Sequence, residues 1–208
     1  MRLIRFFAGT AAVCVGTVTA VDYAAPHWAT VPPSTLLSRY ATAQGTTYTN
    51  SMGAATTYYP VDMCEVEIPS DKMGPLTVDR FVKAFSSSPL FSLERRVHRL
   101  FGVTPSDFSS ESHTHAVGDK MATLWTVESR GPNEVLFVWK SSIGAGATYF
   151  RVTEGPVTML QLGSGEDLTS FGDLSSFGFL YTLATKFHYF HSKCLLLNTA
   201  AMIKWGGS

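Results

Sequence analysis

The chain has 208 residues with 16 basic and 16 acidic side chains, so its formal net charge is zero. Balanced charge argues against a nucleic-acid binder, whose affinity comes from an excess of Lys and Arg that meets phosphates. Charged residues make up 15% of the chain and hydrophobic residues 45%, which is unlike a disordered protein. Length and composition therefore predict one ordinary domain plus an extra segment.

The N-terminal segment begins with Arg2 and Arg5, and an uncharged run follows that ends at Val21. Three interpretations fit this pattern: a secretory signal cleaved after Ala20, a mitochondrial presequence, and a retained membrane helix. A ridge of small side chains favours retention, because small residues every four positions let a second membrane helix approach closely. The residues of this ridge are Ala8, Ala12, Gly16 and Ala20.

We therefore expect residues 1–25 to form an apolar helix that serves as a membrane anchor or targeting segment. An Arg-bearing, acid-free start and the lack of Asn-x-Ser/Thr glycosylation sequences favour the mitochondrial inner membrane. The secretory pathway or another membrane is the alternative. Residues 26–59 read as a connector stiffened by prolines. Within it, Ser34 is expected to cap a short helix through Tyr40, and residues 44–60 read as a loop or irregular strand.

The domain is predicted to begin with a strand over residues 61–69 and a helix over residues 78–85 that Thr77 caps. A second helix follows Ser88-Pro89 and ends at Gly102. Four β-rich runs come next, and Gly/Pro-containing turns separate the first pair and the last pair, which predicts an antiparallel meander. These runs cover residues 121–129, 134–140, 147–153 and 157–164. Helical spacing of apolar residues then predicts one long amphipathic helix over residues 175–205.

The stretch FHYFHSKCL on this long helix places His188, His191 and Cys194 three residues apart. These side chains bind metals, but a zinc site needs four ligands and one helix supplies few. His113, His115 or Cys64 would have to complete such a set. We expect core-facing histidines and no metal or cofactor instead. Cys64 and Cys194 are expected to be buried free thiols, with a disulfide between them as the alternative.

Three segments, SSPLFSLERRVHRLFG, MATLWTVESRGPNEVLFVW and FGFLYTLATKFHYFHSKCLL, resemble the START-like, or helix-grip, superfamily. The order of the predicted elements is also similar, and the likeness covers roughly residues 60–205. The segments look most like those of an uncharacterised, mainly bacterial branch. The resemblance implies an α+β domain over residues 60–208, in which a curved antiparallel sheet grips a long C-terminal helix above an apolar cavity.

No Gly-x-Ser-x-Gly elbow or phosphate-binding loop is present in the sequence, so we expect no enzymatic activity. The favoured hypothesis is a structural accessory subunit of a membrane protein complex, whose partners would be membrane subunits rather than nucleic acid. The alternative is a carrier that binds a lipid or quinone in the cavity. The candidate lining residues are Trp125, Phe137, Trp139, Tyr149, Phe150, Phe187 and His191.

Overall fold

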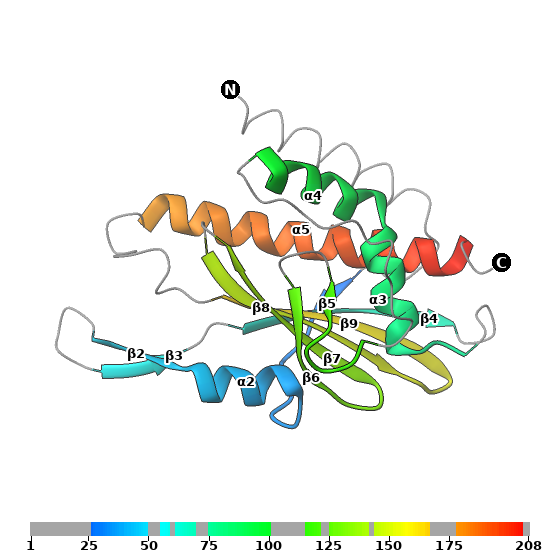
Figure 1. Cartoon of the computed structure of the whole chain (residues 1–208), viewed down its shortest axis with the longest axis horizontal. Coiled ribbons are helices and arrows are strands. Elements are labelled where there is room, and N and C mark those ends of the chain that lie inside the picture. Colours follow the sequence, from blue (N-terminus) through cyan, green and yellow to red (C-terminus); the bar gives the residue numbers. More distant parts are fainter. Residues whose placement is uncertain are drawn as a thin grey trace.

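The computed structural model describes residues 26–49, 55–58, 61–69, 75–100, 115–121, 125–141, 144–166 and 178–205. A curved seven-stranded sheet lies at its centre, with the strand order β1-β4-β9-β8-β7-β6-β5 and antiparallel pairing throughout (Figure 1). Its strands are β1 (His27–Trp28), β4 (Val61–Pro69), β5 (Lys120–Met121), β6 (Trp125–Arg130), β7 (Glu134–Ser141), β8 (Gly144–Thr153) and β9 (Val157–Glu166). A separate two-stranded ribbon pairs β2 (Thr46–Thr49) with β3 (Ala55–Tyr58).

Helices cover both faces of the sheet (Figure 1). One face packs against α2 (Leu36–Gln44), and the other packs against α3 (Val78–Ser87), α4 (Pro89–Leu100) and α5 (Gly178–Trp205). This α+β arrangement of a curved antiparallel sheet and a long C-terminal helix is compatible with a helix-grip fold. The apolar helix expected over residues 1–25 lies outside the described residues. None of the helices described is long and apolar enough to cross a membrane.

The larger core lies between the sheet and the three helices α3, α4 and α5. Alternation along β4 sends Cys64, Val66 and Ile68 into this core, and all three are fully buried. The smaller core lies on the opposite face of the sheet, where Leu37 of α2 packs with Met63 of β4. Both faces of β4 are therefore covered at Met63 and Cys64, which explains why its alternation in the sequence is imperfect.

The long helix α5 is buried on all sides from Cys194 to Ala201. Residues 194–201 all have little or no exposed surface, because the sheet covers one side of the helix while α3 and α4 cover another. The sequence predicted a one-sided apolar stripe here. That prediction is wrong for this segment of α5, since a helix enclosed by neighbours is apolar all round.

Side-chain caps fix where the helices begin. Thr77 Oγ1 accepts a hydrogen bond from the backbone N–H of Arg80 at 3.2 Å, which confirms the predicted cap of α3. The predicted Ser34 cap is wrong, because Thr35 Oγ1 accepts from Ser38 N at 3.2 Å instead. Thr35 also donates to Pro32 O at 2.8 Å, so the proline turn positions Thr35 rather than Ser34.

The meander β6-β7-β8-β9 is confirmed, with two local corrections. The predicted run 121–129 is not a single strand, because Met121 belongs to β5 and pairs antiparallel with Trp125 of β6. The gap between the predicted runs 134–140 and 147–153 is shorter in the structure, because β7 extends to Ser141 and β8 already begins at Gly144. A side chain at Gly146 would place its Cβ 2.4 Å from Gly165 O, so only glycine fits there.

Part of the stretch read as a connector packs against the domain. His27 and Trp28 of β1 pair with Glu65 and Cys64 at the edge of the sheet. Helix α2 buries Leu36 and Leu37 against the sheet. Residues on the N-terminal side of residue 60 therefore pack against the sheet.

Candidate functional site

A polar cluster joins the first half of α5 to the sheet. Asp62 and Ser164 are partners in the register of β4 and β9, and alternation points both side chains toward α5. Ser164 Oγ donates to Asp62 Oδ1 at 3.0 Å. His188 Nε2 lies 2.8 Å from Ser164 Oγ and 3.1 Å from Asp62 Oδ2. The three side chains therefore hold this part of α5 against the edge of the β4-β9 pair.

The geometry of this cluster differs from that of a catalytic triad. A Ser-His-Asp triad uses both ring nitrogens of histidine, one for the serine and the other for the carboxylate. Here Ser164 and Asp62 both approach the same ring nitrogen of His188. The carboxylate thus does not orient the ring from the far side, as base catalysis would require.

The other two candidate metal ligands of α5, His191 and Cys194, contact different partners. His191 Nε2 lies 3.2 Å from Glu94 Oε2 of α4, and their side chains are only 13% and 20% exposed. Cys194 is buried in the larger core. The three residues that the sequence placed three apart thus face three different surroundings. Within the described ranges, no group of three or more His, Cys, Asp or Glu side chains could hold a metal ion.

Both cysteines in the described part of the chain, Cys64 and Cys194, are buried free thiols, as the sequence predicted. Burial raises the pKa of Cys64 to about 12, and the nearby carboxylate of Asp62 adds to that increase. The thiol of Cys64 is 3.5 Å from Leu162 O, to which it donates a weak hydrogen bond. Such a thiol is protonated at neutral pH and unreactive.

Aromatic rings fill the space between α3 and the sheet. Phe150 of β8 lies at the centre, and its ring centroid is 5.3 Å from Phe81, 4.8 Å from Phe85 and 5.8 Å from Phe137. Trp125 closes one side of the group, 5.4 Å from Phe91 of α4. Three candidate lining residues, Phe137, Phe150 and Trp125, therefore come together, but they pack against other side chains.

Trp139 lies on the same face of the sheet, directly opposite Trp125 in the register of β6 and β7. Its ring is partly buried against the larger core and passes over Gly146, where a Cβ would be 2.6 Å from the ring. Trp125 donates from Nε1 to Thr148 Oγ1 at 3.3 Å on this face. This region therefore combines indole rings with the polar Asp62 cluster described above, since Ser164 pairs with Thr148. Phe187 belongs to α5, but its side chain is outside the described residues.

Tyr149 lies on the opposite face of the sheet from Phe150, in the smaller core under α2. Its hydroxyl donates to Glu134 Oε2 at 2.5 Å, and the same oxygen accepts from Leu36 N at 3.4 Å. Burial raises the pKa of Tyr149, and the Glu134 carboxylate raises it further. The prediction that Tyr149 lines a cavity under α5 is therefore wrong.

A second polar cluster, which the sequence analysis missed, ties α3 to β6. Arg130 donates two hydrogen bonds to the carboxylate of Asp79, at 2.8 and 2.6 Å. His115 Nδ1 is 3.0 Å from the same carboxylate, and His115 N donates to it at 3.3 Å. Burial alone would raise the pKa of Asp79, but these hydrogen bonds outweigh burial and lower the pKa to about 2.

Comparisons with known proteins reveal no matching family model and no matching curated protein. Among solved structures, the chain is similar to the crystal structure of CalU16 from Micromonospora echinospora, at 12% identity and a TM-score of 0.31. That match covers 86% of this chain and 99% of CalU16. The solution structure of the same protein matches at 12% identity and a TM-score of 0.33, covering 77% of this chain and 71% of that one.

Proposed function

We propose that this chain is a non-catalytic accessory subunit of a membrane protein complex, held at the membrane by its N-terminal segment. In this proposal the chain belongs to the mainly bacterial branch of the START-like superfamily that its sequence resembles. The mitochondrial inner membrane is the proposed location, because the segment bears Arg2 and Arg5 and lacks acidic residues before Asp22.

The packed interior is the observation that carries this proposal. A carrier needs an open cavity of about 300 Å³ or more to enclose a lipid or quinone. In the described part of the chain, Phe81, Phe85 and Phe137 surround Phe150 where such a ligand would lie. Because these rings pack against one another where a ligand would lie, this part of the interior is suited to a rigid role, in which binding takes place at the surface.

Binding of an apolar ligand is the second candidate, and the region around Trp139 favours it. There, Trp139 and the cluster of Asp62, Ser164 and His188 present aromatic surface and hydrogen-bonding groups on the face that α5 covers. Ligand sites in proteins usually combine apolar walls with a few polar groups of this kind.

Native mass spectrometry of the tagged full chain, purified from membranes in mild detergent, distinguishes the two functions. The accessory role predicts stoichiometric membrane subunits bound to a chain that retains Arg2. A lone domain that begins near Val21 and carries a bound lipid or quinone would contradict it. The Ser164→Ala variant sharpens the test, because loss of one hydroxyl from the polar cluster lowers ligand occupancy only in the second case. Ser34→Ala, which changes an exposed serine, is the matched control.

A further inference from the structure

Exposed aromatic side chains gather where β1 meets α5. Of the five large apolar side chains that are exposed in the described part of the chain, the three aromatic ones lie here. Trp28 is 37% exposed, Tyr189 40% and Phe190 47%. The ring centroids of Trp28 and Tyr189 are 4.6 Å apart, so strand and helix form one continuous surface. We call Trp28, Lys186, Tyr189, Phe190 and Lys193 the aromatic-basic edge.

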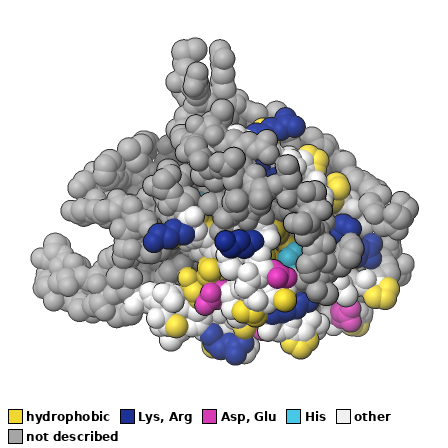
Figure 2. All heavy atoms as spheres, in the orientation of Figure 1, with side chains coloured by type: hydrophobic (Ala, Val, Ile, Leu, Met, Phe, Trp, Pro, Cys, Tyr) yellow, Lys and Arg dark blue, Asp and Glu magenta, His cyan; other side chains and the backbone are white. Residues whose placement is uncertain are grey.

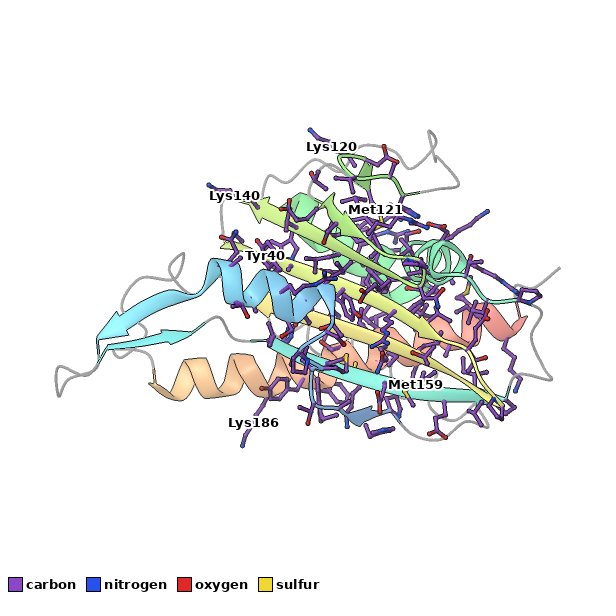
Figure 3. The ribbon with its side chains drawn as sticks, turned by 90° about the horizontal axis from the view of Figure 1, so that it is seen from below. Tyr40, Lys120, Met121, Lys140, Met159 and Lys186 are labelled. Carbon is purple, nitrogen blue, oxygen red and sulfur yellow. The ribbon has the colours of Figure 1, made fainter. Side chains whose placement is uncertain are left out.

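Lysines flank these rings. Lys193 Nζ lies 5.5 Å from the centroid of the Trp28 ring, and the exposed Lys186 points away from the ribbon in Figure 3. At 100° per residue, Lys186, Lys193 and the two aromatic residues of α5 fall within about 100° of the helix circumference. They therefore share one face.

The Lys side chains give α5 charges of positive sign only. The helix carries Lys186, Lys193 and Lys204 but no Asp or Glu, although the chain as a whole has zero net charge. Elsewhere the signs are mixed, and Figure 2 shows basic and acidic side chains interspersed on the described part of the face that it presents. Next to the edge, the carboxylate of Glu65 is engaged by His27 at 2.8 Å and by Gln161 at 2.8 Å. An anionic partner would thus meet positive charge at this edge.

We propose that the aromatic-basic edge lies against the surface of an anionic lipid bilayer. Trp and Tyr rings favour the headgroup region, because one end of each ring is apolar and the other is polar. Lysine ammonium groups bind lipid phosphates and carboxylates and add affinity for each positive charge near the surface. The rings lie on the outer surface of a helix and are about half exposed, which suits shallow insertion among headgroups.

The position of the edge along the chain supports a bilayer as the occupant. Trp28 follows Val21, the last residue of the uncharged N-terminal run, by seven residues. Seven residues of extended chain span at most about 25 Å. If the N-terminal segment is in a membrane, Trp28 stays within that distance of the membrane. The inference rests on the membrane anchoring in the proposed function, and it adds a second, electrostatic contact.

Fluorescence quenching by brominated lipids tests the proposal on the full chain reconstituted into vesicles. One set of vesicles is phosphatidylcholine, and the other also contains phosphatidylserine. We expect the second set to quench more tryptophan emission and the Trp28→Phe variant to lose that additional quenching. Trp125→Phe is the matched control, because Trp125 is buried in the core and its replacement leaves the additional quenching in place.

Charge variants test the role of the lysines. Replacing Lys186 and Lys193 together by Gln weakens the docking equilibrium on phosphatidylserine vesicles by roughly 25-fold, at about five-fold for each charge. Lys140→Gln is the control, since Lys140 is exposed on β7 and lies on the opposite side of the view in Figure 3. Slower amide hydrogen exchange over residues 186–193 on anionic vesicles gives a second readout that needs no substitution.

The outcomes distinguish failure of the docking proposal for the aromatic-basic edge from failure of the N-terminal membrane anchor. If the chain floats with vesicles in high salt but Trp28→Phe leaves the quenching unchanged, the anchor stands and the docking proposal is overturned. Equal quenching on neutral and anionic vesicles also overturns it, since the lysines then have no role. If high salt releases the chain, the anchor fails, whereas salt-sensitive quenching that depends on Trp28 still supports the docked edge.

Discussion

Replacing Asp79 by asparagine tests how strongly the cluster of Asp79, Arg130 and His115 stabilises the fold. The side chain of Asp79 is 20% exposed and that of Arg130 is 26% exposed, so solvent screens the pair only in part. The pKa of Asp79 falls from 3.8 to about 2 on folding. At 1.36 kcal/mol per unit, this shift corresponds to about 2 kcal/mol of unfolding free energy.

The sign of the pH dependence follows from the direction of that shift. Because the folded pKa is lower than the unfolded one, the unfolded chain binds more protons between pH 2 and 4. The stabilisation by Asp79 is therefore complete above about pH 4 to 5 and is lost as the pH falls toward 2. Asp79→Asn should lower the unfolding free energy by about 2 kcal/mol at pH 7 and by little at pH 2.

Urea denaturation of both proteins at a series of pH values measures this difference. Glu67→Gln is the control for loss of one negative charge, since Glu67 is exposed on β4, and its effect should stay within about 0.5 kcal/mol. A loss for Asp79→Asn that is equal at pH 7 and pH 2 would refute the reasoning. The cost would then come from the shape of the side chain rather than from its charge.

Two further substitutions and one thiol-labelling reaction give independent checks on the packing. Asn198→Leu removes the acceptor of Leu90 N, a buried hydrogen bond of 3.3 Å, and should cost about 1–3 kcal/mol in urea denaturation. Gly146→Ala should lower the melting temperature more than Gly155→Ala, because the nearest atom to the new Cβ is at 2.4 Å in the first case and at 3.3 Å in the second. Cys64 should react with a thiol reagent at pH 8 only after unfolding, since burial raises its pKa to about 12. Rapid labelling of the folded protein at Cys64 would contradict this.

Local patterns in the sequence were sufficient to locate most elements. The strand predicted over residues 61–69 has the bounds of β4, and the helix predicted from residue 78 begins where α3 does. The long helix was expected over residues 175–205 and is described over Gly178–Trp205. These elements were predictable because caps, turns and apolar periodicity are properties of neighbouring residues.

The faces of the sheet could not be predicted in the same way. The run ATYFRVT places Tyr149 next to Phe150, and either aromatic residue could have faced α5. The register decides between them, since Tyr149 pairs with Leu136 on the α2 face and Phe150 pairs with Val135 on the other. No property of the β8 sequence alone contains that information.

The polar clusters escaped prediction for a related reason. Asp62 and Ser164 are 102 residues apart, and only the pairing of β4 with β9 brings them together below His188. Asp79 and Arg130 are likewise 51 residues apart. Each side chain taken alone looks like an ordinary surface residue, so the sequence offers no signal until the register is known.

The two halves of α5 meet different physical demands, and this explains why its sequence was difficult to interpret. From Cys194 to Ala201 the helix is enclosed, and polar groups there must be paired, as Asn198 is with the N-terminus of α4. Before Cys194 one face carries Lys186 and Lys193 with exposed rings, while His188 turns toward the sheet. A helix with an enclosed segment and an exposed face next to it has no uniform stripe. The face with Lys186, Tyr189 and Phe190 is therefore available for contacts with a partner or a membrane, and the enclosed segment holds that face rigid.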